Sequence, residues 1–133
     1  ELERRLRTVI DATGRSAPRP RRLLVRSNRR VEFIRTHDID WIGAARNYVK
    51  LHVGHSTHLM RATMKSVENR LDPREFLRIH RSIIVNVDRM REIQPWFHGE
   101  AVVILEDGTR LNLSRSYRPR IERYLDRVAR GLG

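Results

Sequence analysis

The stretch FLRIHRSIIVN, residues 76–86, places polar side chains inside a run of β-branched residues. Three kinds of chemistry fit this pattern. A serine beside a histidine base can act as a nucleophile, a polar cluster can form a buried hydrogen-bond network, and two arginines can bind an anion. The residues concerned are Arg78, His80, Arg81 and Ser82.

Catalysis by His80 and Ser82 lacks a third group. Two residues that are two positions apart on a strand share a face, but nucleophilic catalysis also needs a group that orients the base and an oxyanion site. The sequence contains no GxSxG, GxxxxGK[ST], GxGxxG or HExxH motif and no cysteine. We therefore expect neither an enzyme nor a bound cofactor.

The histidines of HVGHSTH are the candidates for a metal site. His52, His55 and His58 lie around a predicted hairpin turn. A loop of three residues would make His52 and His58 face each other, whereas a loop of two or four would place them on opposite faces. Zinc needs three or four converging ligands, and no carboxylate or cysteine lies in this hairpin. We expect solvated histidines and no metal.

Anion binding is the remaining interpretation of residues 76–86. If this stretch is one strand, Arg81 lies among the isoleucines on one face, where it must reach solvent or meet an anion. The opposite, polar face predicts internal hydrogen bonding. Its members are Arg78, His80, Ser82 and Asn86.

Two other segments share this basic and polar character. Arg46-Asn47-Tyr48 separates two predicted strands, and Ser114-Arg115-Ser116 joins the last strand to the last helix. Arginine and asparagine side chains suit base edges in a major groove, and a serine-capped helix N-terminus suits a phosphate. Taken singly, each segment is equally compatible with an ordinary solvated loop.

The charge balance favours a polyanionic partner. The chain has 28 basic and 16 acidic residues, a net charge of +12, which attracts nucleic acid first and an anionic membrane surface second. Residues 1–36 carry eleven arginines against four acids, so +7 of this charge lies in the first quarter of the chain.

No apolar run is long enough to span a membrane, and the absence of cysteine fits the cytoplasm. A chain that begins at Glu1 is expected to be a fragment.

The element pattern predicts an antiparallel β domain with two small helices. Residues 1–13 are expected to form an amphipathic helix, followed by a proline-rich linker to residue 20. This arm is expected to be the end of a preceding regulatory domain or a dimerising segment. Hairpins are expected at residues 23–34, 47–62 and 101–114, and Pro95 predicts an edge or a bulge. Thr63 can cap a helix that buries Met64, Val67 and Leu71. Ser116 is expected to cap a helix over residues 117–129 with an apolar face made by Tyr117, Ile121, Tyr124, Leu125 and Val128.

These segments together resemble the LytTR family of bacterial DNA-binding domains. The resemblance rests on DIDWIGAARNYVKLHV, FLRIHRSIIVN and LNLSRSY, in this order, and runs from about Arg21 to about Leu125. It implies an elongated antiparallel β sandwich that reads DNA with loops, so residues 21–133 are expected to be the DNA-binding domain.

The resemblance also implies roles for individual residues. Arg46 and Asn47 are expected to enter one major groove and Arg115 the next, with Arg81 near the backbone between them. The expected DNA-binding residues are Arg46, Asn47, Tyr48, Lys50, Arg78, His80, Arg81, Ser82, Ser114, Arg115, Ser116, Tyr117 and Arg118.

The partners implied by the resemblance are double-stranded DNA at promoter direct repeats, a second copy of the protein on that DNA, and an upstream sensor kinase. The kinase would act through a receiver domain that precedes this fragment, in a phosphorylation-controlled response regulator. Some members of the family instead carry transmembrane segments before this domain. The alternative from another class is a basic β module that binds RNA or an anionic membrane surface. Sheets that read RNA expose pairs of aromatic residues, and no such pair is found in the predicted strands.

Overall fold

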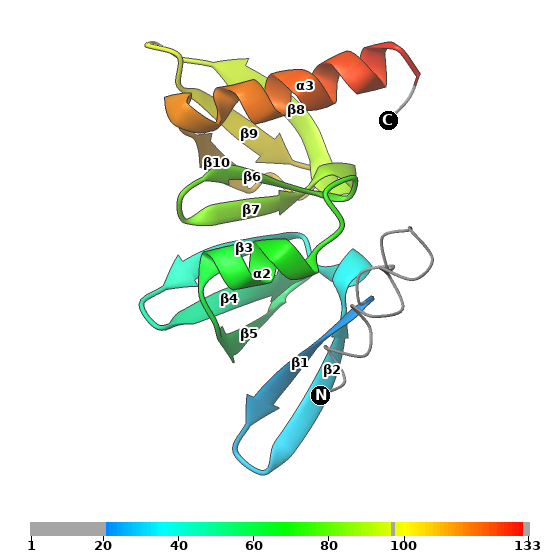
Figure 1. Ribbon diagram of the computed structural model, residues 1–133, viewed down its shortest axis with the longest axis vertical. Coiled ribbons are helices and arrows are strands. Elements are labelled where there is room, and N and C mark those ends of the chain that lie inside the picture. The colour runs from blue at the N-terminus through cyan, green and yellow to red at the C-terminus, as the bar shows by residue number, and fades with distance from the viewer. Residues whose placement is uncertain (1–20, 97, 132–133) are drawn as a thin grey trace, which may run out of the picture.

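The computed structural model describes residues 21–96 and 98–131 of the protein. The predicted arm and linker of residues 1–20 lie outside this range. The described chain is mainly β, with three antiparallel sheets stacked along the long axis of the molecule and two helices beside them (Figure 1). This arrangement confirms the predicted fold class.

Most of the predicted elements are present. The strands are β1 (Arg22–Ser27), β2 (Arg30–Arg35), β3 (Trp41–Ala45), β4 (Tyr48–Val53), β5 (Ser56–Arg61), β6 (Phe76–His80), β7 (Ile83–Asn86), β8 (Met90–Pro95), β9 (Ala101–Leu105) and β10 (Arg110–Leu113). The helices are α2 (Met64–Arg70) and α3 (Arg118–Ala129), and single 3-10 turns are η1 (Thr36–Asp38), η2 (Val87–Arg89) and η3 (Arg115–Tyr117).

The three sheets follow one another along the molecule. β1 and β2 form a hairpin, the central sheet has the order β5-β4-β3-β7-β6, and the last sheet has the order β10-β9-β8. The predicted hairpins β1–β2, β4–β5 and β9–β10 are confirmed, and Pro95 ends the edge strand β8, as expected.

Two hydrophobic cores lie on opposite faces of the central sheet. The first contains Ile42, Leu51 and Ile84 with residues of α2 and the β1–β2 hairpin, and the second lies between β6–β7, the last sheet and α3. Ile84 and Val85 are neighbours in β7, yet each belongs to a different core, because successive side chains of a strand point to opposite faces. The central sheet therefore joins the two halves of the molecule.

Helix α2 begins as predicted. The Thr63 hydroxyl accepts a hydrogen bond from the Ser66 backbone N–H at 3.1 Å, and the Ser66 hydroxyl accepts one from the Thr63 N–H at 3.2 Å. This reciprocal pair is a capping box, which satisfies two donors at the helix start. Met64, Val67 and Leu71 are buried beneath the helix.

The prediction of one strand over residues 76–86 is wrong. Arg81 and Ser82 form the turn of a hairpin, and β6 pairs with β7 on either side with an irregular register between Arg78 and His80. Arg81 is therefore exposed at a turn and does not lie among the isoleucines. Asn86 lies at the far end of β7, where its amide donates to the Ile39 carbonyl oxygen at 2.8 Å, so it is not part of a network with His80.

The predicted cap and apolar face of the last helix also need correction. α3 begins at Arg118 after the turn η3, Tyr117 occupies the N-cap position, and no side chain caps the helix, so Ser116 does not do so. Ile121 is buried, whereas Leu125 and Val128 are exposed because the second core ends before the last turns of the helix. No helix in the described residues is long and apolar enough to cross a membrane.

Candidate nucleic-acid interface

Three turns that are distant in the sequence lie along one side of the molecule. In Figure 1 the end of β3, the turn between β6 and β7, and the start of α3 all lie on the left. Backbone hydrogen bonds link these turns: the Ala44 N–H donates to the Ser82 carbonyl oxygen and the Ser114 N–H to that of Ile79, both at 2.9 Å. We call the turns at residues 46–47, 81–82 and 114–117 the turn edge.

The first turn of the edge presents Arg46 and Asn47. Both residues are exposed between the paired residues Ala45 and Tyr48. Arg46 has a φ of 58°, in the left-handed region that a non-glycine residue occupies at a cost of about 1 to 3 kcal/mol. A tight turn thus fixes the direction of the chain and leaves both side chains open to a ligand.

The outer face of β4 continues this basic surface. Tyr48 and Lys50 are exposed on it, and His52 stacks on Trp41 of β3 with ring centroids 3.8 Å apart. Gly43 leaves room for that indole, because a Cβ at this position would lie 2.9 Å from the Trp41 ring. Burial, followed by the nearby Lys50 charge, lowers the pKa of His52 below its ordinary value of 6.5.

Side chains rather than a glycine hold the second turn. The Arg78 guanidinium donates to the Arg81 carbonyl oxygen at 2.6 Å and to that of His80 at 3.4 Å. It also pairs with the Glu68 carboxylate on α2 at 3.2 Å. The Ser82 backbone N–H donates to Nδ1 of His80 at 3.0 Å, so His80 carries its proton on Nε2 when neutral.

The two arginines of the second turn therefore have different surroundings. Only 15% of the Arg78 side chain is exposed, and three acceptors occupy its guanidinium group. Arg81 is exposed at the tip of the turn and makes no ion pair within the described residues. Arg78 thus holds the turn, while Arg81 is open to a ligand.

The third turn presents Arg115. Its aliphatic side chain crosses the turn between β8 and β9, where a Cβ on Gly99 would lie 2.9 Å from the Arg115 Cγ. Gly99 has a φ of 80°, so its missing side chain serves both the turn and the close approach of Arg115. Ser114 and Ser116 precede and follow Arg115 in the sequence, and their hydroxyl oxygens lie 3.3 Å apart.

Two further expected site residues, besides those that hold the second turn, make contacts within the protein. Tyr117 is half-buried, with the Arg78 and Arg120 guanidinium groups 5.5 and 5.0 Å from its ring centroid. Arg118 pairs with Glu122 one helical turn later, at 2.9 Å. Tyr117 packs under α3, and Arg118 lies exposed at the start of the helix.

Sequence reasoning missed two residues that position the edge. Glu68 anchors Arg78 from α2, and Gly99 accommodates Arg115 from another hairpin. Gly99 could have been noticed in the sequence, because it is a glycine between two predicted strands. Glu68 has none, because its partner is ten residues away on a different element.

The hairpin histidines do not converge. The loop between β4 and β5 has two residues, so His52 is opposite Thr57 and His58 is opposite Leu51. The two side chains therefore lie on opposite faces of the hairpin. Within residues 21–96 and 98–131 no group of three or more potential metal ligands gathers.

Comparison with known sequences defines the class of protein. The profile of the LytTr DNA-binding domain matches residues 29–126, which is most of the chain. The solved structure of a LytTr DNA-binding domain from Bacillus cereus superposes with a TM-score of 0.72, covering 80% of this chain and 97% of the other at 21% identity, and so shares the fold. The chain belongs to the LytTR family of DNA-binding domains.

The curated proteins that resemble this chain are longer than it is. The chain is 26% identical over 119 residues to the sensory transduction protein LytT of Bacillus subtilis, covering 90% of the chain and 49% of that protein. It is 29% identical over 106 residues to the transcriptional regulatory protein LytR of Staphylococcus aureus, covering 80% and 43% respectively. The chain spans about half the length of the curated relatives it matches.

Proposed function

We propose that the turn edge binds double-stranded DNA in a sequence-specific manner and that the chain is the output domain of a transcriptional regulator. The supporting observation is that Arg46, Arg81 and Arg115 are exposed on three turns along one side of the molecule. The paired strands of the sheets fix the positions of the turns. Guanidinium groups arranged in such a row can bind the regularly spaced phosphates and base edges of DNA.

In this proposal each turn contacts a different part of the DNA. Arg46 and Asn47 read bases in one major groove, Arg115 reads the next, and Arg81 contacts the backbone between them. Tyr48, Lys50 and the hydroxyls of Ser114 and Ser116 add contacts around these residues. The support comes from exposure and from the order of the turns along the edge.

The remaining expected residues hold the second and third turns in position. Arg78, His80 and Ser82 hold the second turn through the hydrogen bonds described above. Tyr117 and Arg118 form the start of α3 and so set the position of Arg115. Substitution of one of them should lower the free energy of unfolding more than it changes the preference for one DNA sequence over another.

The wider context of the proposal follows the relatives. The names LytT and LytR describe sensory transduction and transcriptional regulation in those proteins. By analogy, this domain would serve a cytoplasmic response regulator that receives phosphate from a sensor kinase through another domain and pairs on direct repeats in promoters. Phosphorylation would then control how two copies meet on DNA.

Selection from a random duplex library, followed by anisotropy titrations, tests the proposal. We expect a preferred sequence with two short blocks separated by about one helical turn of DNA. Arg81→Ala should weaken binding to all sequences evenly, as loss of a phosphate contact does. Equal affinity for the selected duplex, random duplex, single-stranded RNA and anionic vesicles would refute sequence-specific recognition.

A further inference from the structure

A groove between α2 and α3 lies away from the turn edge. Its volume is about 510 Å³, in the range of small-molecule sites. Helix α3 begins beside Arg115 and runs from the edge toward the opposite side of the molecule (Figure 1). Arg127 lies nine residues after Arg118, or roughly 13 Å further along the helix. The α3 wall of the groove is thus distinct from the surface proposed for DNA, and Arg78 joins the other end of the groove to the second turn.

The floor of the groove is apolar and lies where the two cores meet. Leu71 and Ile84 belong to the first core, whereas Leu77 belongs to the second. Leu77, at 9%, exposes more of its surface than Leu71 or Ile84, so it makes most of a small apolar floor between polar walls. An apolar group of a ligand would contact both halves of the molecule here.

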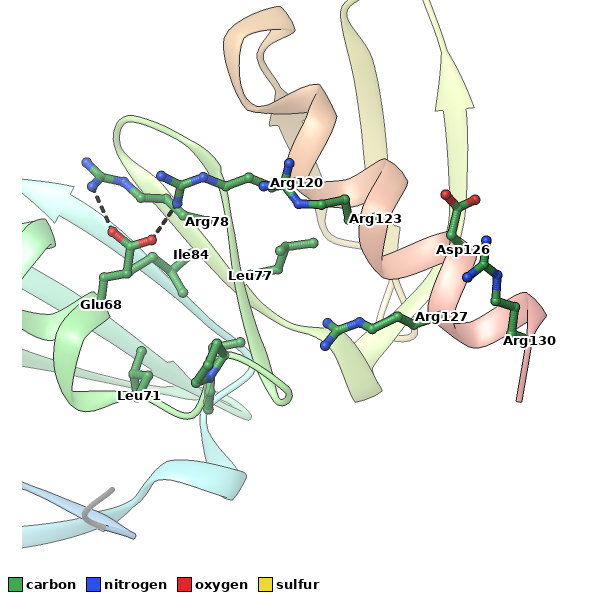
Figure 2. A pocket seen from close by; sticks show the side chains of 12 residues that line it. Glu68, Leu71, Leu77, Arg78, Ile84, Arg120, Arg123, Asp126, Arg127 and Arg130 are labelled. Carbon is green, nitrogen blue, oxygen red and sulfur yellow. Dashed lines mark hydrogen bonds and ion pairs between the residues drawn. The ribbon is translucent and has the colours of Figure 1, made fainter. Parts of the chain in front are cut away.

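Fixed arginines close one end of the groove. One oxygen of Glu68 accepts from Arg78 at 3.2 Å and the other from Arg120 at 2.6 Å, as Figure 2 shows. Both guanidinium groups also lie near the ring of Tyr117. This carboxylate therefore has its partners, and it fixes the position of two cationic groups.

Open arginines line the rest of the α3 wall. Arg123, Arg127 and Arg130 are spaced by four and three residues, which places them on one helical face, and all three are exposed. In the described part of the chain none of the three forms an ion pair. With Arg78 and Arg120 the groove holds five arginines against Glu68 and Asp126, a net charge of +3.

We propose that this groove binds a small organic anion, with a carboxylate or phosphate group on a compact apolar body. The oxyanion would meet Arg123 and Arg127, whose planar guanidinium groups suit such oxygens, and the apolar body would lie on Leu77 and Ile84. A concave surface with low-dielectric walls strengthens the field of the uncompensated arginines. The proposal does not rest on DNA binding by the turn edge.

Bound at this position, the anion ties α2 to α3. It therefore stabilises the junction between the half that carries Arg46 and the half that carries Arg115. Such a ligand is expected to raise the melting temperature of the whole chain, because it binds the folded state alone.

Titration with anilinonaphthalene sulfonate, an anion on an aromatic body that fluoresces in apolar surroundings, tests the proposal at low salt. Arg123→Gln and Arg127→Gln should each raise the Kd by about tenfold, the effect of losing one charged hydrogen bond. Arg110→Gln, an equal change of charge at an exposed residue of β10, should leave the Kd unchanged. Methyl NMR signals of Leu77 and Ile84 should shift on titration, and added duplex DNA should not displace the probe.

Three outcomes would overturn the proposal. The first is equal binding by the wild type, Arg123→Gln and Arg127→Gln while the methyl signals stay unmoved. The second is loss of binding in Arg22→Gln, which would place the probe on the exposed face of the β1–β2 hairpin, where Arg22 lies 5.0 Å from the Phe33 ring centroid. The third is displacement of the probe by duplex DNA. Circular dichroism melts of each variant exclude unfolding as the cause.

Discussion

The turn edge and the groove between α2 and α3 are both rich in arginine, yet they use it differently. At the edge, Arg46, Arg81 and Arg115 are exposed singly on separate turns. In the groove, Arg78 and Arg120 share one carboxylate and lie beside an apolar floor. Isolated guanidinium groups along a line suit a long, regular polyanion, whereas clustered groups in a hollow suit a compact one.

Arg78 and Arg81 show this difference at the smallest scale. They are three residues apart, but the hairpin reverses the chain between them, so one faces Glu68 and the other faces solvent. The chemical role of an arginine in this protein therefore depends on what occupies its donors. The comparison predicts separable effects of substitutions in the two regions.

The largest expected effect is that of salt on duplex binding. If the edge neutralises about six phosphates, affinity should fall roughly a thousandfold between about 50 and about 200 mM salt. Arg81→Ala should reduce the slope of log affinity against log salt by about one, and Arg127→Gln should leave it unchanged. Anisotropy titrations measure both slopes, and a salt-independent affinity would remove the electrostatic basis of the account.

Removal of a single base contact comes next. Arg115→Ala and Asn47→Ala should each cost about 1 to 3 kcal/mol on the preferred duplex and little on random duplex, because base contacts carry discrimination. Arg110→Ala is the matched control on β10. Competition assays against random duplex give the specificity ratio, and an unchanged ratio in both variants would exclude these residues from base reading.

The shared carboxylate of the groove should matter for stability. Glu68→Gln leaves Arg78, of which only 15% is exposed, without its counter-charge, so the free energy of unfolding should fall by about 1 to 3 kcal/mol. Glu122→Gln breaks only an exposed pair with Arg118 and should cost less than about 0.5 kcal/mol. Urea denaturation compares the two variants. Similar losses in both would mean that Glu68 is an ordinary surface residue.

Arg46→Gly separates binding from stability at the edge. Glycine relieves the left-handed strain at a φ of 58° but adds freedom to the unfolded chain, so stability should change by no more than about 1 kcal/mol. Duplex affinity should nevertheless fall about tenfold, because the guanidinium is lost. A parallel loss of stability and binding would show that Arg46 supports the turn instead.

The smallest effect concerns pH and the outer face of β4. Burial lowers the pKa of His52 below 6.5, so folding favours the neutral imidazole. Stability should be greatest above pH 6.5 and decline as the pH falls below that value, where the unfolded chain binds more protons. His52→Phe keeps a ring against Trp41 and should flatten this decline. Thermal melts from about pH 7.5 to about pH 5.5 test it, and an equally steep decline in His52→Phe would assign the effect to other groups.

The hairpins could be predicted where the turn residues are visible in the sequence. Asn28, Gly54 and Gly108 have positive φ, and each lies in the turn that follows a predicted strand. The turn at Arg81 and Ser82 contains no such residue. Its reversal depends on hydrogen bonds from side chains and on Glu68, which only the tertiary fold brings near. A local pattern therefore predicted one strand where the chain makes a hairpin.

The sequence indicated the segments of the candidate site and the different surroundings of Arg78 and Arg81, but not the contacts that produce them. Basic and polar residues at the three turns marked the segments, and the resemblance to the family ordered them. Which arginine is paired and which is open depends on contacts between elements that are distant in the sequence, such as Gly99 with Arg115. These contacts are a property of packing, so residue type and spacing did not reveal them.

An NMR titration of the protein with duplex DNA tests the central claim most directly. We predict that the backbone amide signals of residues 46–47, 81–82 and 115–116 shift most and move together as duplex is added. The signals of residues 123–130 on α3 should move least. The largest shifts in the groove between α2 and α3 or on the β1–β2 hairpin, with the three turns unmoved, would contradict the assignment of the turn edge to DNA.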